Sequence, residues 1–164
     1  MIGFVAYTAT TPAIAQSNAP YTLIPAEARK PAPDFLLTDL DGKKLTLAQY
    51  RGRVVLLDFW AVDCGGCKIE IPWYVAFDKS YRAQSLQLVG IDMYGESPAV
   101  VKPFMVKSGM NYPVAIGNDA IGTQFHVDEM PLTLLIDRKG RVAISHAGIV
   151  DRTKFEQAIQ ELLR

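Results

Sequence analysis

Cysteine and histidine are both scarce in this chain of 164 residues, with two of each. Two cysteines cannot form the set of several disulfides that stabilises many small secreted domains. A structural zinc site usually takes four cysteine or histidine ligands, and the chain has only one closely spaced pair of cysteines. We therefore expect neither a disulfide framework nor a bound metal or other cofactor, and the two cysteines need another role.

An excess of charge of one sign is also missing, because 17 lysines and arginines balance 17 aspartates and glutamates. Such a chain has no overall field to attract nucleic acid, so we expect no nucleic-acid partner. Hydrophobic residues make up 49% and charged residues 21% of the sequence, which is typical of an ordinary globular protein. A chain of this length fits one domain with one core.

The N-terminal residues 1–15 carry no charge and end in Ala13-Ile14-Ala15, an A-x-A pattern typical of a signal-peptide cleavage site. The positively charged start of a signal peptide is missing, and the apolar stretch is too short to span a membrane. We predict a signal peptide that is truncated at its start, with a disordered tail as the alternative. Export would place the protein in the periplasm or elsewhere outside the cytoplasm, with the N-terminus as a membrane anchor if it is retained.

Residues 16–33 contain four prolines and several alanines. This stretch is too rich in proline for a helix and lacks the alternation of a strand. We predict a linker over residues 16–33 and a folded domain over residues 34–164. The domain should begin with a β-hairpin, because Asp41-Gly42 lies between two apolar runs.

The rest of the domain alternates between patterns typical of strands and of helices. Residues 54–60 form a short apolar run typical of a buried strand, with Asp58 as its one acid. The order of elements predicts an α/β sandwich of three layers, with a central mixed β-sheet, helices on both faces and the added N-terminal hairpin. The further strands are predicted at 86–93, 132–137 and 141–145, and the helices at 69–84, at 97–109 and from Asp151 onward.

The two cysteines, Cys64 and Cys67, lie between the buried strand and the helix that follows it. This order predicts that Cys64 is at the helix N-terminus and Cys67 is one turn inside. Free N–H groups and the helix dipole stabilise a thiolate there and lower the pKa of a cysteine from about 8.5 to within about 3.5 to 7.5. Cys64 can attack a substrate disulfide, and Cys67 can then attack the mixed disulfide and release the reduced product. The pair therefore predicts thiol-disulfide exchange.

Two other roles remain open for a lone pair of cysteines. A fixed stabilising disulfide is the weaker alternative, because a bridge across so few residues removes little loop entropy. A copper(I) carrier is the other, because soft sulfur ligands select that ion. His126 and His146 are expected to be surface or core residues, so the two thiolates alone would have to hold the metal.

Several segments carry a resemblance to a known family. Leu57–Ala61 (LDFWA), the CxxC pair and Glu129–Thr133 (EMPLT) resemble the thioredoxin superfamily, over residues from about 34 to the end. Cys67–Pro72 (CKIEIP), the N-terminal hairpin and Leu134–Gly140 (LLIDRKG) resemble the TlpA/ResA branch of extracytoplasmic thioredoxin-like proteins. The combination is specific, whereas a CxxC pair alone is not.

The resemblance implies roles for four residues besides Cys64 and its partner. Pro131 is similar to the family's cis-proline, which faces the cysteines and, with Met130 before it, presents backbone to a bound substrate. Asp58 is similar to the buried acid that accepts a proton from Cys67. Glu70 is similar to the acid near the active site in the TlpA/ResA branch. The alternatives are an ordinary loop proline, a merely hydrogen-bonded buried carboxylate and a helix-surface charge, respectively.

The sequence also departs from the thioredoxin pattern. Asp63 stands where thioredoxins usually have tryptophan, and its negative charge opposes thiolate formation at the next residue. Gly65 and Gly66 replace a pair that contains proline, which frees the backbone and can loosen the helix start. Trp60 and Trp73 are candidates for an apolar rim that contacts partners, although core packing is the commoner fate of tryptophan.

The resemblance implies a thiol-disulfide oxidoreductase outside the cytoplasm. The expected form is a monomeric disulfide reductase that acts on oxidised proteins such as apocytochrome c and receives electrons from a membrane thiol-disulfide donor. A peroxiredoxin-like peroxidase is a weaker alternative. That family would have a proline and a threonine just before its cysteine, and this chain has Ala61-Val62-Asp63.

Overall fold

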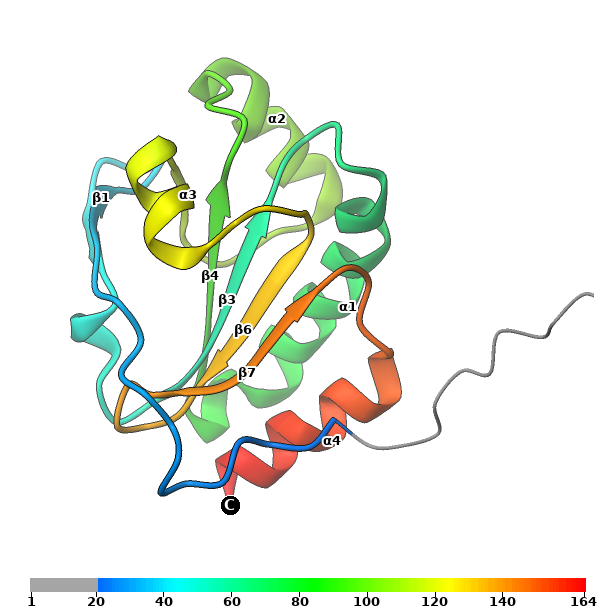
Figure 1. The fold of residues 1–164 in the computed structure, drawn as a ribbon. Coiled ribbons are helices and arrows are strands. Elements are labelled where there is room, and N and C mark those ends of the chain that lie inside the picture. The colour runs from blue at the N-terminus through cyan, green and yellow to red at the C-terminus, as the bar shows by residue number, and fades with distance from the viewer. Residues whose placement is uncertain (1–20) are drawn as a thin grey trace, which may run out of the picture.

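The computed structural model describes residues 21–164, and the predicted signal peptide at 1–15 lies outside them. Within the described residues, five strands form a mixed sheet in the order β5-β4-β3-β6-β7 (Figure 1). Strand β4 is parallel to β3 and β5, whereas β6 is antiparallel to β3 and β7. A separate hairpin, β1 (Leu36–Thr38) and β2 (Lys44–Thr46), confirms the predicted one. The sheet strands are β3 (Val54–Trp60), β4 (Leu86–Asp92), β5 (Val114–Ile116), β6 (Leu132–Ile136) and β7 (Val142–Ala147).

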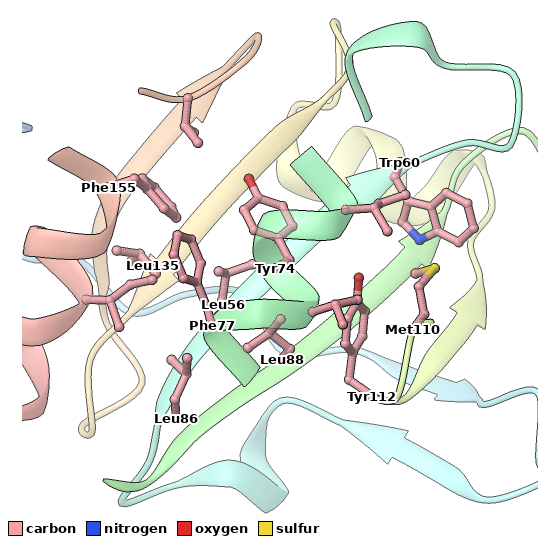
Figure 2. Close-up of a cluster of buried hydrophobic side chains, with 14 of the residues drawn as sticks. Leu56, Trp60, Tyr74, Phe77, Leu86, Leu88, Met110, Tyr112, Leu135 and Phe155 are labelled. Atoms are coloured by element: carbon pink, nitrogen blue, oxygen red, sulfur yellow. The ribbon is translucent and has the colours of Figure 1, made fainter. Parts of the chain in front are cut away.

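Helices cover both faces of the sheet, as predicted. Helices α1 (Gly65–Tyr81) and α4 (Arg152–Leu163) pack on one face through the cluster of large side chains in Figure 2, which α2 (Pro98–Ser108) also joins. Helix α3 (Asp119–Phe125) and the hairpin cover the other face. The three-layer α/β sandwich is therefore confirmed. No helix in the described part of the chain is both long and apolar enough to cross a membrane.

Strand β3 brings an acid beneath the first helix. Both faces of this central strand are covered, so all seven of its residues are buried. Successive side chains point to opposite faces of a sheet, and Leu56 and Trp60 pack on the α1 side. Asp58, which stands between them, therefore faces α1. The strand ends at Trp60, shortly before Cys64.

Strand β5 and helix α3 have no counterpart among the predicted elements. Their lengths are three and seven residues, too short for a hydrophobic period to show in the sequence. Asn118 begins α3, because its side-chain oxygen accepts a hydrogen bond from the Ile121 N–H at 3.0 Å. The chain then leads from α3 to the loop that contains Pro131.

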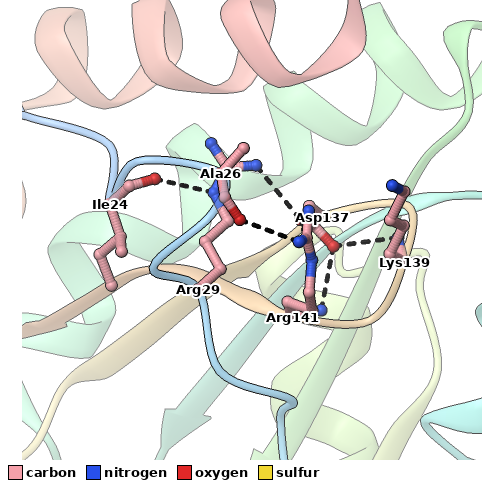
Figure 3. Close-up of polar contacts among 6 residues, drawn as sticks. All are labelled: Ile24, Ala26, Arg29, Asp137, Lys139 and Arg141. Atoms are coloured by element: carbon pink, nitrogen blue, oxygen red, sulfur yellow. Dashed lines mark hydrogen bonds and ion pairs between the residues drawn. The ribbon is translucent and has the colours of Figure 1, made fainter.

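Residues 21–33, which we name the N-terminal arm, run along β7 instead of forming a free linker. The carbonyl of Lys30 accepts a hydrogen bond from the Val142 N–H at 2.9 Å. Arg29 donates to the carboxylate of Asp137 at 3.2 Å (Figure 3). The described part of the predicted linker at 16–33 therefore packs on the domain.

Candidate active site around Cys64 and Cys67

Cys64 and Cys67 form a disulfide at the start of α1. Cys64 is the N-cap residue of the helix, and its sulfur accepts a hydrogen bond from the Cys67 N–H at 3.1 Å. Cys64 is partly exposed, whereas Cys67 is 1% exposed. Cys64 is thus the more accessible residue of the pair, which is the arrangement expected of an attacking and a resolving cysteine.

Pro131 has a cis peptide bond to Met130, as predicted. It lies close to the dipeptide between the cysteines. A Cβ added at Gly66 would be 3.0 Å from Cδ of Pro131 and 3.1 Å from Cγ1 of Ile149, whereas one at Gly65 would meet no atom within 4 Å. Gly66 therefore allows two loops to approach the cysteines closely. This packing role was not expected from the sequence, which suggested only a looser helix start.

Asp58 lies on the face of the sheet against which Cys67 packs. It is 2% exposed, and neither of its carboxylate oxygens has a hydrogen-bond partner in the described chain. Burial and, secondly, the negative charge of Glu70 raise the pKa of Asp58 well above its usual range. A carboxylate in this setting binds a proton strongly, which fits the proton-accepting role implied by the resemblance.

Glu70 is fully buried, so the surface-charge alternative is wrong. It follows Cys67 by three residues, and this spacing places both side chains on the inward face of α1. Its Oε1 accepts a hydrogen bond from the Val150 N–H at 2.6 Å, while Oε2 has no partner in the described chain. Burial raises the pKa of Glu70 to about 7, against the opposing effect of the Val150 bond. Glu70 can therefore exchange a proton near neutral pH.

Tyr74 and Thr133 stand beside the two acids and were not predicted. Their hydroxyl oxygens are 2.8 Å apart, and Thr133 is paired in register with Asp58 across β3 and β6. Burial and the charges of Asp58 and Glu70 raise the pKa of Tyr74 well above its usual range. The tyrosine therefore stays protonated and can act as a hydrogen-bond donor within the buried cluster.

A hollow of about 490 Å³ opens beside Cys64. Met130 lies in its wall, the place expected of a residue that contacts substrate. Tyr94, 63% exposed, also lines it and was not predicted. The wall consists of Asp63, Cys64, Gly65, Gly66, Tyr94, Val127, Asp128, Glu129 and Met130.

Trp60, predicted to form part of a rim that contacts partners, is fully buried at the end of β3. Its ring stacks on Phe104 of α2 with the ring centroids 5.3 Å apart, and Figure 2 shows it within the core. The prediction for Trp60 is therefore wrong, because its position on β3 points it beneath the helices. Trp73 is half-buried and packs against the same core. The exposed apolar side chain beside the cysteine dipeptide is instead Ile149, 46% exposed.

A second pair of acids supports the loop before Cys64. Asp92 accepts a hydrogen bond from the Glu96 N–H, and the Glu96 carboxylate accepts one from the Val62 N–H, both at 3.1 Å. Asp92 is fully buried, and burial together with contacts to Glu96 raises the pKa of Asp92 to about 7. The pair was not predicted, because neither residue belongs to a recognisable motif.

The histidines play no visible part in the site. His126 ends α3, and the ring of His146 packs edge-on against Tyr21. Among residues 21–164, no group of three or more histidine, cysteine, aspartate or glutamate side chains is placed to hold a metal ion.

Comparison with known proteins gives matches over most of the chain. A sequence profile of the AhpC/TSA family matches residues 28–145. The thiol-disulfide oxidoreductase ResA of Bacillus subtilis (strain 168) is 35% identical over 133 residues, which cover 80% of this chain and 72% of ResA.

Solved structures agree with this relationship. A candidate thiol:disulfide interchange protein DsbE from Chlorobium tepidum is 32% identical with a TM-score of 0.76, and the match covers 83% of this chain and 97% of that one. The pneumococcal exposed lipoprotein thioredoxin from Streptococcus pneumoniae strain TIGR4 is 26% identical with a TM-score of 0.67, over 79% of this chain and 100% of that one. The chain belongs to the AhpC/TSA family, and its similarity to ResA makes it a thioredoxin-like thiol-disulfide oxidoreductase.

Proposed function

We propose that this protein is a disulfide reductase that acts on oxidised proteins outside the cytoplasm. One observation carries the proposal: the disulfide joins a partly exposed cysteine to a buried one, and two buried acids of raised pKa, Asp58 and Glu70, lie on the buried side. A pair arranged in this way can pass electrons to a substrate and be reduced again by a dithiol donor.

The reduced protein acts in two exchange steps. The thiolate of Cys64 attacks one sulfur of the substrate disulfide, which breaks, and the other substrate sulfur leaves as a thiolate and takes a proton from solvent. Cys67 then gives its proton to the carboxylate of Asp58 or Glu70 and attacks the sulfur of Cys64. The second substrate sulfur leaves as a thiolate and is protonated in turn. Two electrons and two protons have passed to the substrate, and the Cys64–Cys67 disulfide remains.

We place the substrate chain in the hollow beside Cys64, along Met130 and Pro131. Backbone groups at a cis-proline can pair with an extended chain in the manner of an added strand. The support is the position of Met130 in the wall of the hollow and the close approach of Pro131 to Gly66.

The proposed location and partners have separate support. The signal-like residues 1–15 favour export, and one similar structure is described as an exposed lipoprotein thioredoxin. The resemblance to the TlpA/ResA branch suggests apocytochrome c among the substrates and a membrane thiol-disulfide protein as electron donor. We propose that the protein acts as a monomer, which sedimentation of the purified chain would test.

The reduction potential of the Cys64/Cys67 couple tests the proposed direction. The purified protein is equilibrated with defined thiol-disulfide buffers and the fraction of disulfide is measured. We expect a value near that of thioredoxin, about −270 mV, whereas a value near about −120 mV, as in DsbA, would indicate a disulfide-donating oxidase. A Cys67→Ser variant should trap a mixed disulfide with the substrate, and Cys64→Ser is its control.

The same experiment separates the copper(I) alternative. If Cys64 and Cys67 form no reversible disulfide in these buffers, the oxidoreductase proposal fails. Anaerobic titration with copper(I), compared with a Cys64→Ser variant, would then test whether the two thiolates hold the metal.

A further inference from the structure

The loop between β7 and α4, residues 148–151, is held by three hydrogen bonds from its own backbone N–H groups. Each bond goes to a different part of the molecule: the cis-proline, the active-site acid and the N-terminal arm. The bonds are Gly148 N–H to the Pro131 carbonyl at 2.8 Å, Val150 N–H to Oε1 of Glu70 at 2.6 Å, and Asp151 N–H to the Tyr21 hydroxyl at 2.8 Å.

Tyr21 is fixed by more than its hydroxyl group. Its ring makes edge contacts with His146 of β7 and Phe155 of α4, with centroids 5.1 and 5.7 Å apart. Further along the arm, Arg29 is anchored to Asp137 (Figure 3). The arm therefore offers a fixed acceptor to the start of α4.

Tyr21 and Glu70 accept hydrogen bonds from consecutive residues, Asp151 and Val150. Consecutive peptide groups are joined by only two soft dihedrals, so release of the Asp151 N–H frees the Val150 N–H to move. The bond from Val150 is the largest influence that favours the charged form of Glu70 against burial. The geometry of the loop is thus linked to the protonation of Glu70.

We propose that Tyr21 is a positioning residue for Glu70, because its hydroxyl holds the loop backbone where the Val150 N–H reaches the Glu70 carboxylate. The N-terminal arm then forms part of the active site, although it lies outside the sheet and the cysteine motif. This inference rests on the proposed function of Glu70 as a proton acceptor in thiol exchange.

The expected direction follows from charge. Without the Tyr21 hydroxyl, the bond from Val150 to Glu70 weakens, and the charged form of Glu70 loses stabilisation. The titratable groups around Glu70 are Asp58 of β3, Tyr74 of α1 and Tyr21 itself. A change of Tyr21 to phenylalanine leaves Asp58 and Tyr74 in place. Because Glu70 must be ionised to accept a proton, the pH dependence of the thiol chemistry should shift upward.

The test compares full-length Tyr21→Phe with Tyr81→Phe. The Tyr81 hydroxyl also bonds to α4, through Glu156 at 2.7 Å, so its loss is a matched control further along the helix. The rate at which the reduced protein cleaves dithiobis-nitrobenzoate is followed from pH 5 to 9. We expect the midpoint of the Tyr21→Phe profile to rise by about half a pH unit. Below the midpoint, this shift corresponds to a rate about threefold lower than that of the unaltered protein. The Tyr81→Phe profile should match that of the unaltered protein.

A Glu70→Gln variant separates this inference from the proposed function. If Glu70→Gln leaves the pH profile unchanged, the proposed role of Glu70 fails. If Glu70→Gln alters the profile while Tyr21→Phe does not, only the positioning role of Tyr21 is overturned. In the double variant, Tyr21→Phe should add no further shift to that of Glu70→Gln, and an added shift would show that Tyr21 acts by another route.

Discussion

At the scale of single residues, the two glycines between the cysteines have different surroundings. A methyl group at Gly66 would press on Pro131 and Ile149, whereas one at Gly65 would meet open space. We predict that Gly66→Ala lowers the free energy of unfolding of the oxidised protein by about 1–2 kcal/mol, because it forces two loops apart. Gly65→Ala should raise it by up to about 1 kcal/mol, because alanine is the better helix former. Denaturant titrations measure both values, and equal effects would contradict the packing role of Gly66.

Glu70 should give the protein a pH-dependent stability. Burial raises its pKa from 4.5 to about 7 in the folded state, so between these pH values the folded protein binds more protons than the unfolded chain. Its contribution to stability is therefore greatest at low pH and is lost as the pH rises toward about 7. From pH 5 to pH 8 the free energy of unfolding should fall in both proteins. We predict that the fall is about 1–2 kcal/mol smaller in Glu70→Gln than in the unaltered protein. Urea titrations at the two pH values test this, and parallel losses would argue against a raised pKa.

At the scale of elements, the N-terminal arm is joined to the turn between β6 and β7 through Asp137. This carboxylate accepts hydrogen bonds from Arg29 and Arg141 (Figure 3). We predict that Arg29→Ala lowers the free energy of unfolding at pH 7 by about 1–2 kcal/mol, because it removes a charged partner of a buried carboxylate. Lys30→Ala, which shortens the exposed side chain beside it, should change the value by less than about 0.5 kcal/mol.

The effect of Arg29→Ala should also depend on pH. Burial alone would raise the pKa of Asp137, but the hydrogen bonds and charges of Arg141 and Arg29 outweigh it and hold the pKa below 3.8. The stability that this carboxylate supplies is therefore present above pH 3.8 and is lost as the pH falls through the folded-state value. The difference between Arg29→Ala and the unaltered protein should shrink in acid, and a constant difference would contradict the ion pair.

The sequence predicts long periodic elements better than short ones. The apolar run of β3 and the hairpin of β6 and β7 show in the residue pattern itself, whereas β5 and α3 are too short to show a period. The arm has no periodicity either, because its position depends on distant partners, such as the 108 residues that separate Arg29 from Asp137. Its packing therefore becomes visible only in the folded chain.

The residues of the candidate site also differ in how well the sequence predicts them. Cys64, Cys67 and Glu70 lie within one short motif, so a resemblance can carry them all. Val150 and Tyr21 reach Glu70 from the far end of the chain and from the arm, and no local pattern marks them. The prediction for Trp60 was wrong for a related reason. A side chain at the end of a strand is exposed or buried according to which elements pack over it, and no local pattern in the sequence shows that packing.

At the scale of the whole molecule, charges from several elements act together on the redox couple. Asp63, Asp128 and Glu129 lie in the wall of the hollow beside Cys64, and none of the residues that line this wall is basic. Negative charge opposes the Cys64 thiolate of the reduced protein, whereas the disulfide carries no charge. This distribution favours the oxidised state and makes the reduced protein a ready electron donor.

Unfolding moves these negative charges away from the thiolate, which favours unfolding of the reduced protein only. The free energy of unfolding should therefore be greater for the oxidised protein than for the reduced protein. We predict that it melts about 5 °C or more above the reduced protein. DsbA, in which the reduced form is stabilised, is the opposite case and a strong oxidant. Thermal unfolding with and without a dithiol reductant measures the difference, and a variant with both Cys64→Ser and Cys67→Ser controls for effects of the reductant itself. A reduced protein that melts higher would mean that the site stabilises its thiolate, and electrons would then flow from substrate to protein.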